Sequence, residues 1–305
     1  MSQLIAGALA LALSVSLVLL TATGFTLLAS VWPQAAQHLF AAAGVELVTY
    51  GIGSACLLTW LRPRTKLWSL RRLSFGVLVC SALAGVALHG PLDYIEHWVE
   101  HLLPLSDAVW SERAARLSPP SAGERALLMI AVAGVVPLVE EYFFRGALFE
   151  LLGRSRGSAH VVPWAAANPG LAPLESRSAL PRANSSFGEW AFPIGLSSVC
   201  FALSHGEPRN WPALLLVAGV MGLLRVASGS LYPSILLHAA FNATTLVVSY
   251  STSVSSHTRA TPGLGGALLG SCVSGLLLAF ALSSRKSRGE RRASGEQFET
   301  KDGVR

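Results

Sequence analysis

The stretch RALLMIAVAGVVPLVEEYFFRGALFELL, residues 125–152, decides the fold class of this chain. It is long and apolar enough to cross a bilayer, which takes about 20 residues of helix. Yet Glu140, Glu141 and Arg145 lie close together inside it. An ionisable side chain in the hydrocarbon core costs roughly 3 kcal/mol, so such residues are rare and usually functional. The stretch therefore predicts a membrane-spanning helix that carries a polar site.

The composition of the whole chain agrees with a lipid environment. Of 305 residues, 52% are hydrophobic and only 13% are charged, against about 25% charge in a typical soluble domain. The net charge of +6 comes from Lys and Arg between the apolar runs and in the tail, as is typical of cytoplasmic membrane-flanking segments. We therefore expect the lipid bilayer as a partner and no nucleic acid.

Seven further apolar segments accompany this stretch, so we predict an all-α polytopic membrane protein with about eight transmembrane helices. Lys and Arg collect in alternate connections, which places both termini in the cytoplasm. The Ala-, Arg- and Gly-rich composition favours a GC-rich bacterium, and hence the bacterial cytoplasmic membrane. The eight segments lie at about 4–29, 39–61, 74–92, 125–152, 187–205, 211–227, 231–250 and 263–283.

The connections divide the chain into four parts. The DYIEHWVEHLL segment, residues 93–103, has apolar residues at helical spacing and predicts a separate amphipathic helix at the membrane interface. Residues 153–186 are rich in Ser, Pro, Gly and Arg and predict a mobile cytoplasmic loop. The parts are N-terminal helices with the interfacial helix (1–124), a central core (125–250), a final transmembrane helix (251–283) and a polar cytoplasmic tail without regular structure (284–305).

The charged residues of the central stretch predict two carboxylates with different tasks. Glu141 and Arg145 are four residues apart, so they share one helical face and can pair. Glu140 is rotated by about 100° around the helix and points toward the face of Phe144. One carboxylate is then neutralised by arginine, and the other is free to act as a base.

Two later spans carry further polar side chains at helical spacing. SSVCFALSHG (197–206) places Phe201 and His205 four residues apart, and SILLHAAFNAT (234–244) does the same for His238 and Asn242. A charge cluster that only locks helices together would explain the Glu and Arg residues alone. It does not readily explain two histidines and an asparagine on two more spans, which favours a reaction centre.

The ordered set EExxxR, FxxxH and HxxxN resembles the three motifs of the CPBP family, which includes type II CAAX prenyl proteases and bacteriocin-processing or self-immunity membrane proteins. The resemblance covers roughly residues 125–245 and implies eight membrane helices around a polar intramembrane cavity. It also implies glutamate-dependent peptide hydrolysis within the membrane. The substrate would be a peptide or protein with an apolar or lipidated segment, such as a prenylated tail, a leader peptide or a C-terminal sorting signal.

The resemblance also assigns roles to the residues. Glu140 and His205 would hold and deprotonate a water molecule, while His238 and Asn242 would stabilise the oxyanion. Glu141, Arg145 and Phe201 would support the site. Glu140, His205 and His238 also form a ligand set that suits zinc, so a metal cofactor stays open at this stage.

Other interpretations remain open from the sequence. His97, Glu100 and His101 fit the HxxEH pattern of inverted zinc proteases, with Glu175 or Glu189 as a distant third ligand. Ser197 or Ser198 with His238 would resemble a rhomboid-like dyad. A non-enzymatic protein, either a proton-coupled transporter or a protease-like scaffold or immunity protein, is the alternative from another class.

Overall fold

The computed structural model describes residues 3–33, 39–61, 73–117, 119–157, 187–252 and 263–299. Helices are the only regular secondary structure in this part of the chain. Each of the eight predicted segments coincides with one helix or one continuous helical run. The prediction of an all-α polytopic protein is therefore confirmed.

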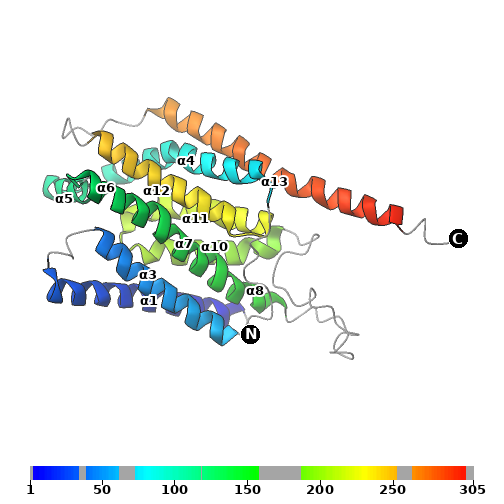
Figure 1. Cartoon of the computed structure of the whole chain (residues 1–305), viewed down its shortest axis with the longest axis horizontal. Helices are drawn as coiled ribbons and strands as arrows, with labels where there is room; N and C mark the ends of the chain where they lie inside the picture. Colours follow the sequence, from blue (N-terminus) through cyan, green and yellow to red (C-terminus); the bar gives the residue numbers. More distant parts are fainter. Residues whose placement is uncertain are drawn as a thin grey trace.

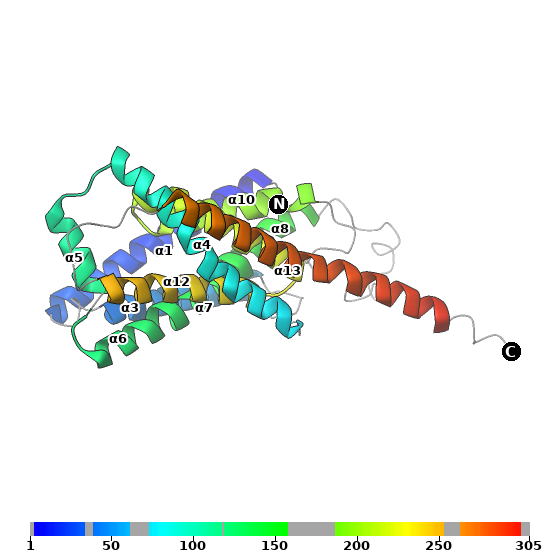
Figure 2. The same cartoon turned by 90° about the horizontal axis from the view of Figure 1, so that it is seen from above.

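The helices lie side by side in a bundle, with the short helix α5 at one end (Figures 1 and 2). The fourth predicted segment is a composite run in which two π-helical segments, η1 and η2, alternate with three α-helices. The elements are α1 (Gln3–Val31), α3 (Leu39–Leu61), α4 (Phe75–Leu102), α5 (Asp107–Leu117), α6 (Ala122–Met129), η1 (Ile130–Val135), α7 (Val136–Glu141), η2 (Tyr142–Leu148), α8 (Phe149–Gly157), α10 (Phe187–Ser204), η4 (Pro208–Asn210), α11 (Trp211–Ser228), α12 (Tyr232–Thr252) and α13 (Leu264–Glu299).

Length and composition identify this bundle as an integral, multi-pass membrane protein. Five helical stretches within the described residues are long and apolar enough to cross a membrane: Gln3–Val31, Phe75–Leu102, Ala122–Gly153, Pro208–Ser228 and Leu264–Ala281. Two shorter apolar helices, Ala41–Leu57 and Trp190–Ser204, accompany them. Large apolar side chains on the outer helices are exposed, such as Leu19 on α1 and Leu276 on α13, as expected where lipid is the solvent.

Two sequence predictions about the ends of helices are wrong. The segment 93–103 is not a separate interfacial helix, because α4 runs without a break to Leu102 and contains Pro91. Proline frees the carbonyl of Ala87, and α13 approaches that carbonyl so closely at Gly270 that a Cβ there would lie 2.6 Å from the oxygen. Membrane helices tolerate proline when a neighbouring helix covers the freed group in this way.

The second correction concerns the polar tail. α13 does not end at Ser284 but continues to Glu299, so most of the predicted unstructured tail is helical. Residues 284–299 contain four Arg and three Glu, which favour helix, whereas the prediction considered only the polarity of this segment. The predicted loop 153–186 begins inside α8, and its remainder from residue 158 lies outside the described residues.

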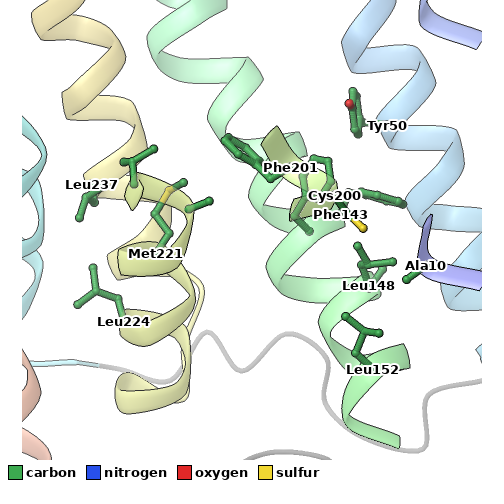
Figure 3. Close-up of a cluster of buried hydrophobic side chains, with 14 of the residues drawn as sticks. Ala10, Tyr50, Phe143, Leu148, Leu152, Cys200, Phe201, Met221, Leu224 and Leu237 are labelled. Atoms are coloured by element: carbon green, nitrogen blue, oxygen red, sulfur yellow. The ribbon is translucent and has the colours of Figure 1, made fainter. Parts of the chain in front are cut away.

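The core of the bundle surrounds the composite helix. Phe143 and Leu148 on η2, Phe201 on α10, Met221 on α11 and Leu237 on α12 are all nearly or completely buried. Figure 3 shows these side chains gathered between the ribbons, with Tyr50 of α3 on the far side of Phe143. The same elements carry the three motifs, so packing of the core also brings the polar residues together.

One close approach fixes α12 against α4. A Cβ at Gly85 of α4 would overlap the carbonyl oxygen of Leu237, and only glycine leaves room for that backbone. Leu237 directly precedes His238, so this contact fixes the position of the motif histidine along the axis of the bundle.

Candidate active site

The composite helix loses its regular hydrogen bonding just before the two glutamates. In η1 the Val136 N–H reaches back five residues to the Ala131 carbonyl, and in that register the carbonyl of Val132 would need the N–H of Pro137, which has none. Asn242 Nδ2 of α12 donates to this Val132 oxygen instead, at 2.9 Å. π-Helical segments are frequent at functional sites, and here one creates the polar link between two motif helices.

The predicted pair of Glu141 and Arg145 is confirmed. Arg145 Nη1 donates to Glu141 Oε1 at 2.7 Å, and both side chains are completely buried. Arg145 Nη2 donates to the Ala218 carbonyl of α11 at 3.2 Å. The guanidinium also lies over the ring of Phe201, 4.4 Å from its centroid. The arginine therefore ties three helices together around one buried charge.

Arg225 of α11 supports the same segment from the other side and was missed at the sequence level. Its Nε donates to the Arg145 carbonyl at 3.1 Å, and the side chain is almost fully buried. A basic residue near the end of a span looked like an ordinary flanking charge. The partner that gives it a role is 80 residues earlier in the chain.

His238 lies between the two glutamates. Its Nδ1 is 3.3 Å from Glu141 Oε1, and its Nε2 is 3.7 Å from Glu140 Oε2. Glu141 Oε1 accepts from Arg145 and is the oxygen nearest to Nδ1, so we assign the ring hydrogen of His238 to Nδ1. Glu141 thus orients His238 as well as neutralising Arg145, and His238 presents Nε2 toward Glu140.

Among the described residues, Glu140 has fewer positively charged partners at bonding distance than Glu141. It is 4% exposed, and its Oε2 has no hydrogen-bond partner among the described residues. The distance of 3.7 Å to His238 Nε2 is beyond a direct hydrogen bond. The different tasks predicted for the two acids agree with this geometry, since only Glu141 has an arginine at bonding distance.

His205 belongs to the same site but does not touch Glu140 in the structure. Its ring contacts Phe201 with 4.7 Å between centroids, and Phe201 contacts His238 at 5.6 Å, so both histidines pack against the same phenyl ring. His205 Nδ1 donates to the Phe201 carbonyl at 2.8 Å. A carbonyl only accepts, so Nδ1 carries hydrogen and Nε2 of the neutral ring is free to accept a proton.

Two side chains of α3 also belong to the surroundings of the site, and neither was predicted from the sequence. Glu46 interacts electrostatically with Glu140 and His205, and Tyr50 interacts with Glu140, Glu46 and the side chain of Ser204. The Tyr50 ring also packs against Phe143, 5.6 Å between centroids. A single acid inside an otherwise apolar run was the available signal for Glu46.

A protein-family model also matches the part of the chain that carries this site. Residues 122–244 match the family model described as type II CAAX prenyl endopeptidase Rce1-like. This segment of the chain is similar to that family. All three motifs lie inside the matched residues, which confirms the resemblance found in the sequence, and the family supports a protease. Curated proteins and solved structures gave no match to the chain.

The Rce1-like domain does not show a metal centre in its described part. No group of three or more His, Cys, Asp or Glu side chains among the described residues is arranged to hold a metal ion. Glu140 and His238 are close to each other, whereas His205 is connected to His238 through the ring of Phe201, which contacts both histidines. The zinc set of Glu140, His205 and His238 would need His205 to move, and zinc stays an untested prediction.

The alternative HxxEH motif is not part of the Rce1-like site. His97 and His101 lie at the end of α4 with their Nε2 atoms 3.1 Å apart. Glu175 lies outside the described residues, as does the side chain of Glu189.

The two candidate serine nucleophiles form hydrogen bonds within their own helix. The Ser197 and Ser198 hydroxyls donate to the Ile194 carbonyl, at 3.2 and 2.7 Å, whereas His238 faces the glutamates. A serine nucleophile activated by His238 therefore has no support in this geometry.

Proposed function

We propose that this protein is an intramembrane endopeptidase in which Glu140 activates water for peptide hydrolysis. The observation that carries the proposal is the contrast between two adjacent buried acids. Glu141 Oε1 is 2.7 Å from Arg145 Nη1 and 3.3 Å from His238 Nδ1, whereas Glu140 Oε2 is 3.7 Å from His238 Nε2. The Oε2 atoms of both acids lack a hydrogen-bond partner among the described residues, so the contrast lies in the arginine. A buried carboxylate kept free of strong partners is suited to accept a proton.

The proposed reaction starts with a water molecule held by Glu140 and His205. Glu140 accepts one proton as the water oxygen attacks the peptide carbonyl, which adds roughly 10²–10⁴-fold to the rate. In its imidazolium form His238 donates from Nε2 to the oxyanion, and the second Nδ2 hydrogen of Asn242, beyond the one given to Val132, donates to it as well. Each such donor contributes about 10²–10³-fold. The carbon–nitrogen bond then breaks, and the leaving nitrogen takes up a proton from the site.

The substrate we propose is a membrane-associated protein or peptide, cut near its C-terminus or at a leader. A groove of about 1070 Å³ between α1 and α3 supports an apolar or lipidated segment as the anchor. Apolar side chains such as Leu20, Trp32 and Val48 line it, and Phe143 of η2 is also part of its lining. Phe143 also contacts Phe144, four residues from Glu140, so an anchor in the groove would place the chain next to the site.

We also propose that both termini lie in the cytoplasm of a bacterial inner membrane. The basic connections of the sequence support this orientation. A reporter enzyme that is active only in the cytoplasm, fused after residue 305, should be active. A reporter inserted at residue 105, in the connection after α4, should be silent, and the reverse pattern would contradict the orientation.

The test of the function uses Glu140→Ala in the native host. Membrane proteomes of cells with the wild-type protein and with Glu140→Ala are compared for uncut precursors. The matched control is Glu124→Gln, because Glu124 is a partly exposed acid in the capping box of α6, outside the site. Precursors should accumulate only with Glu140→Ala at equal protein levels. A folded Glu140→Ala protein that processes the same precursors at the normal rate would refute the proposal.

A further inference from the structure

The composite helix changes its hydrogen-bond register at two places, one on each side of the motif glutamates. At the end of η1 the Val136 N–H bonds to a carbonyl five residues back, and not to the Val132 carbonyl that an α-helix would use. At the end of η2 the Phe149 N–H bonds to a carbonyl three residues back, and not to the Arg145 carbonyl. The carbonyls of Val132 and Arg145 therefore both lose their α-helical donor.

A side chain from another helix bonds to each of these two carbonyls. Asn242 Nδ2 of α12 donates to Val132 at 2.9 Å, and Arg225 Nε of α11 donates to Arg145 at 3.1 Å. Asn242 belongs to the third motif, whereas Arg225 lies outside all three motifs. A buried carbonyl without a partner is costly, so each bond stabilises the irregular register beside it.

The position of Arg225 is fixed by its own helix. The side chain is 6% exposed and lies in the last turn of α11. Gly229 ends this helix with a φ of +66°, in the left-handed region that favours glycine, and its N–H bonds to the Arg225 carbonyl at 3.0 Å. Backbone and side chain of Arg225 are therefore both held against η2.

The register of η2 matters because Arg145 lies inside it. Each residue turns an α-helix by about 100°, so a change of register between Tyr142 and Leu148 would redirect the Arg145 side chain. That side chain now reaches Glu141 Oε1 at 2.7 Å, and the same oxygen is 3.3 Å from His238 Nδ1. The bond at the Arg145 carbonyl thus supports the geometry of the buried pair.

We propose, on the basis of the function above, that Arg225 is a positioning residue for cleavage, whose Nε holds η2 in the register that directs Arg145 to Glu141. Glu141 orients His238, and His238 presents Nε2 toward Glu140. Arg225 acts through these side chains and not by contact with the substrate. A displacement of about 1 Å at a reacting group can cost about 100-fold in rate.

Three substitutions separate the hydrogen bond from the charge, because they differ at the atom that replaces Nε. Arg225→Gln is neutral but has an amide nitrogen, which is a donor, at this fourth position of the side chain. Arg225→Lys keeps the charge but has a carbon atom there, and Arg225→Met has a methyl group and no charge. The control is Arg209→Met, because Arg209 donates to the Pro104 carbonyl at 3.0 Å, outside the site.

A first experiment tests the hydrogen bond without a substrate. Hydrogen–deuterium exchange of the purified full-length protein is followed by mass spectrometry in peptides that cover η2 and, as a reference, α4. Arg225→Met and Arg225→Lys should speed exchange in η2 by about tenfold or more and leave α4 unchanged. Arg225→Gln and Arg209→Met should exchange in η2 nearly as the wild-type protein does.

A second experiment tests the role in catalysis, with the precursor that accumulates in Glu140→Ala cells as the substrate. Arg225→Met should lower kcat by about 10–100-fold and leave KM nearly unchanged, because the reacting groups are displaced while the substrate still binds. Arg225→Gln should recover most of the rate and Arg225→Lys little of it. Arg209→Met should keep the wild-type rate.

The outcomes separate this inference from the proposed function. Wild-type exchange in η2 for Arg225→Met, equal acceleration in η2 and α4, or faster exchange in Arg225→Gln than in Arg225→Lys would overturn the hydrogen bond. Glu140-dependent cleavage at the wild-type kcat in Arg225→Met, or a rate recovered by lysine but not by glutamine, would overturn the role. Absence of any Glu140-dependent precursor would refute the function, while the exchange experiment would still decide the hydrogen bond.

Discussion

The buried pair of Glu141 and Arg145 gives a prediction whose size follows from the structure. Arg145→Met keeps the length of the side chain but leaves the Glu141 carboxylate, which is 0% exposed, without its cation. Removing one partner of a buried pair costs about 3–5 kcal/mol, and we expect the lower end because His238 Nδ1 stays 3.3 Å from the carboxylate. Loss of the hydrogen bond to Ala218 adds about 1 kcal/mol.

The expected loss is therefore about 4 kcal/mol, or a fall in Tm of about 8 °C at about 2 °C per kcal/mol. Thermal unfolding in detergent, followed by the fluorescence of the eight tryptophans, measures it. Arg125→Met is the control and should cost less, since that side chain is nearer the surface, donates to the carbonyls of Pro119 and Pro120 and lies 5.7 Å from the centroid of the Tyr250 ring.

The double variant Glu141→Gln/Arg145→Met decides whether the uncompensated charge is the cause. It removes both charges, so it should be more stable than Arg145→Met alone by about 2 kcal/mol. A single variant that loses less than about 1 kcal/mol, or a double variant less stable than the single one, would refute the reasoning.

Three further predictions concern the surroundings of the site. Gly85→Ala should lower both Tm and the rate of cleavage, because the added Cβ would overlap the Leu237 carbonyl. Gly275→Ala, which has open space around it, should lower neither, and equal effects of the two substitutions would contradict the close approach. Asn242→Leu should cost about 1–3 kcal/mol by leaving the Val132 carbonyl unpaired, and Pro137→Ala, which returns a backbone N–H, should recover stability but not cleavage. Dialysis of the purified enzyme against a chelator should leave cleavage intact, and a loss restored by Zn²⁺ alone would show that the metal set is needed.

Local helical geometry explains why much of this site could be predicted from the sequence. The i,i+4 spacing of Glu141 and Arg145 fixes their pairing whatever surrounds them, and the same spacing unites Phe201 with His205. Hydropathy was sufficient for the eight helices, because lipid demands apolar segments of a set length.

The features that were missed depend on partners far away in the chain. The bond from Asn242 to Val132 joins residues 110 positions apart, at a carbonyl that the π-helical register and Pro137 leave without a backbone donor. The continuity of α4 through Pro91 likewise depends on Gly270 of another helix covering the freed carbonyl. No local pattern contains these contacts.

The central claim is that Glu140 is the base of an intramembrane protease. The most direct measurement compares the wild-type protein and Glu140→Ala, both reconstituted in lipid vesicles, by the rate at which each cuts the precursor found in the proteome comparison. We predict a fall of at least about 100-fold with Tm nearly unchanged. Cleavage at the wild-type rate by a folded Glu140→Ala protein would contradict the account.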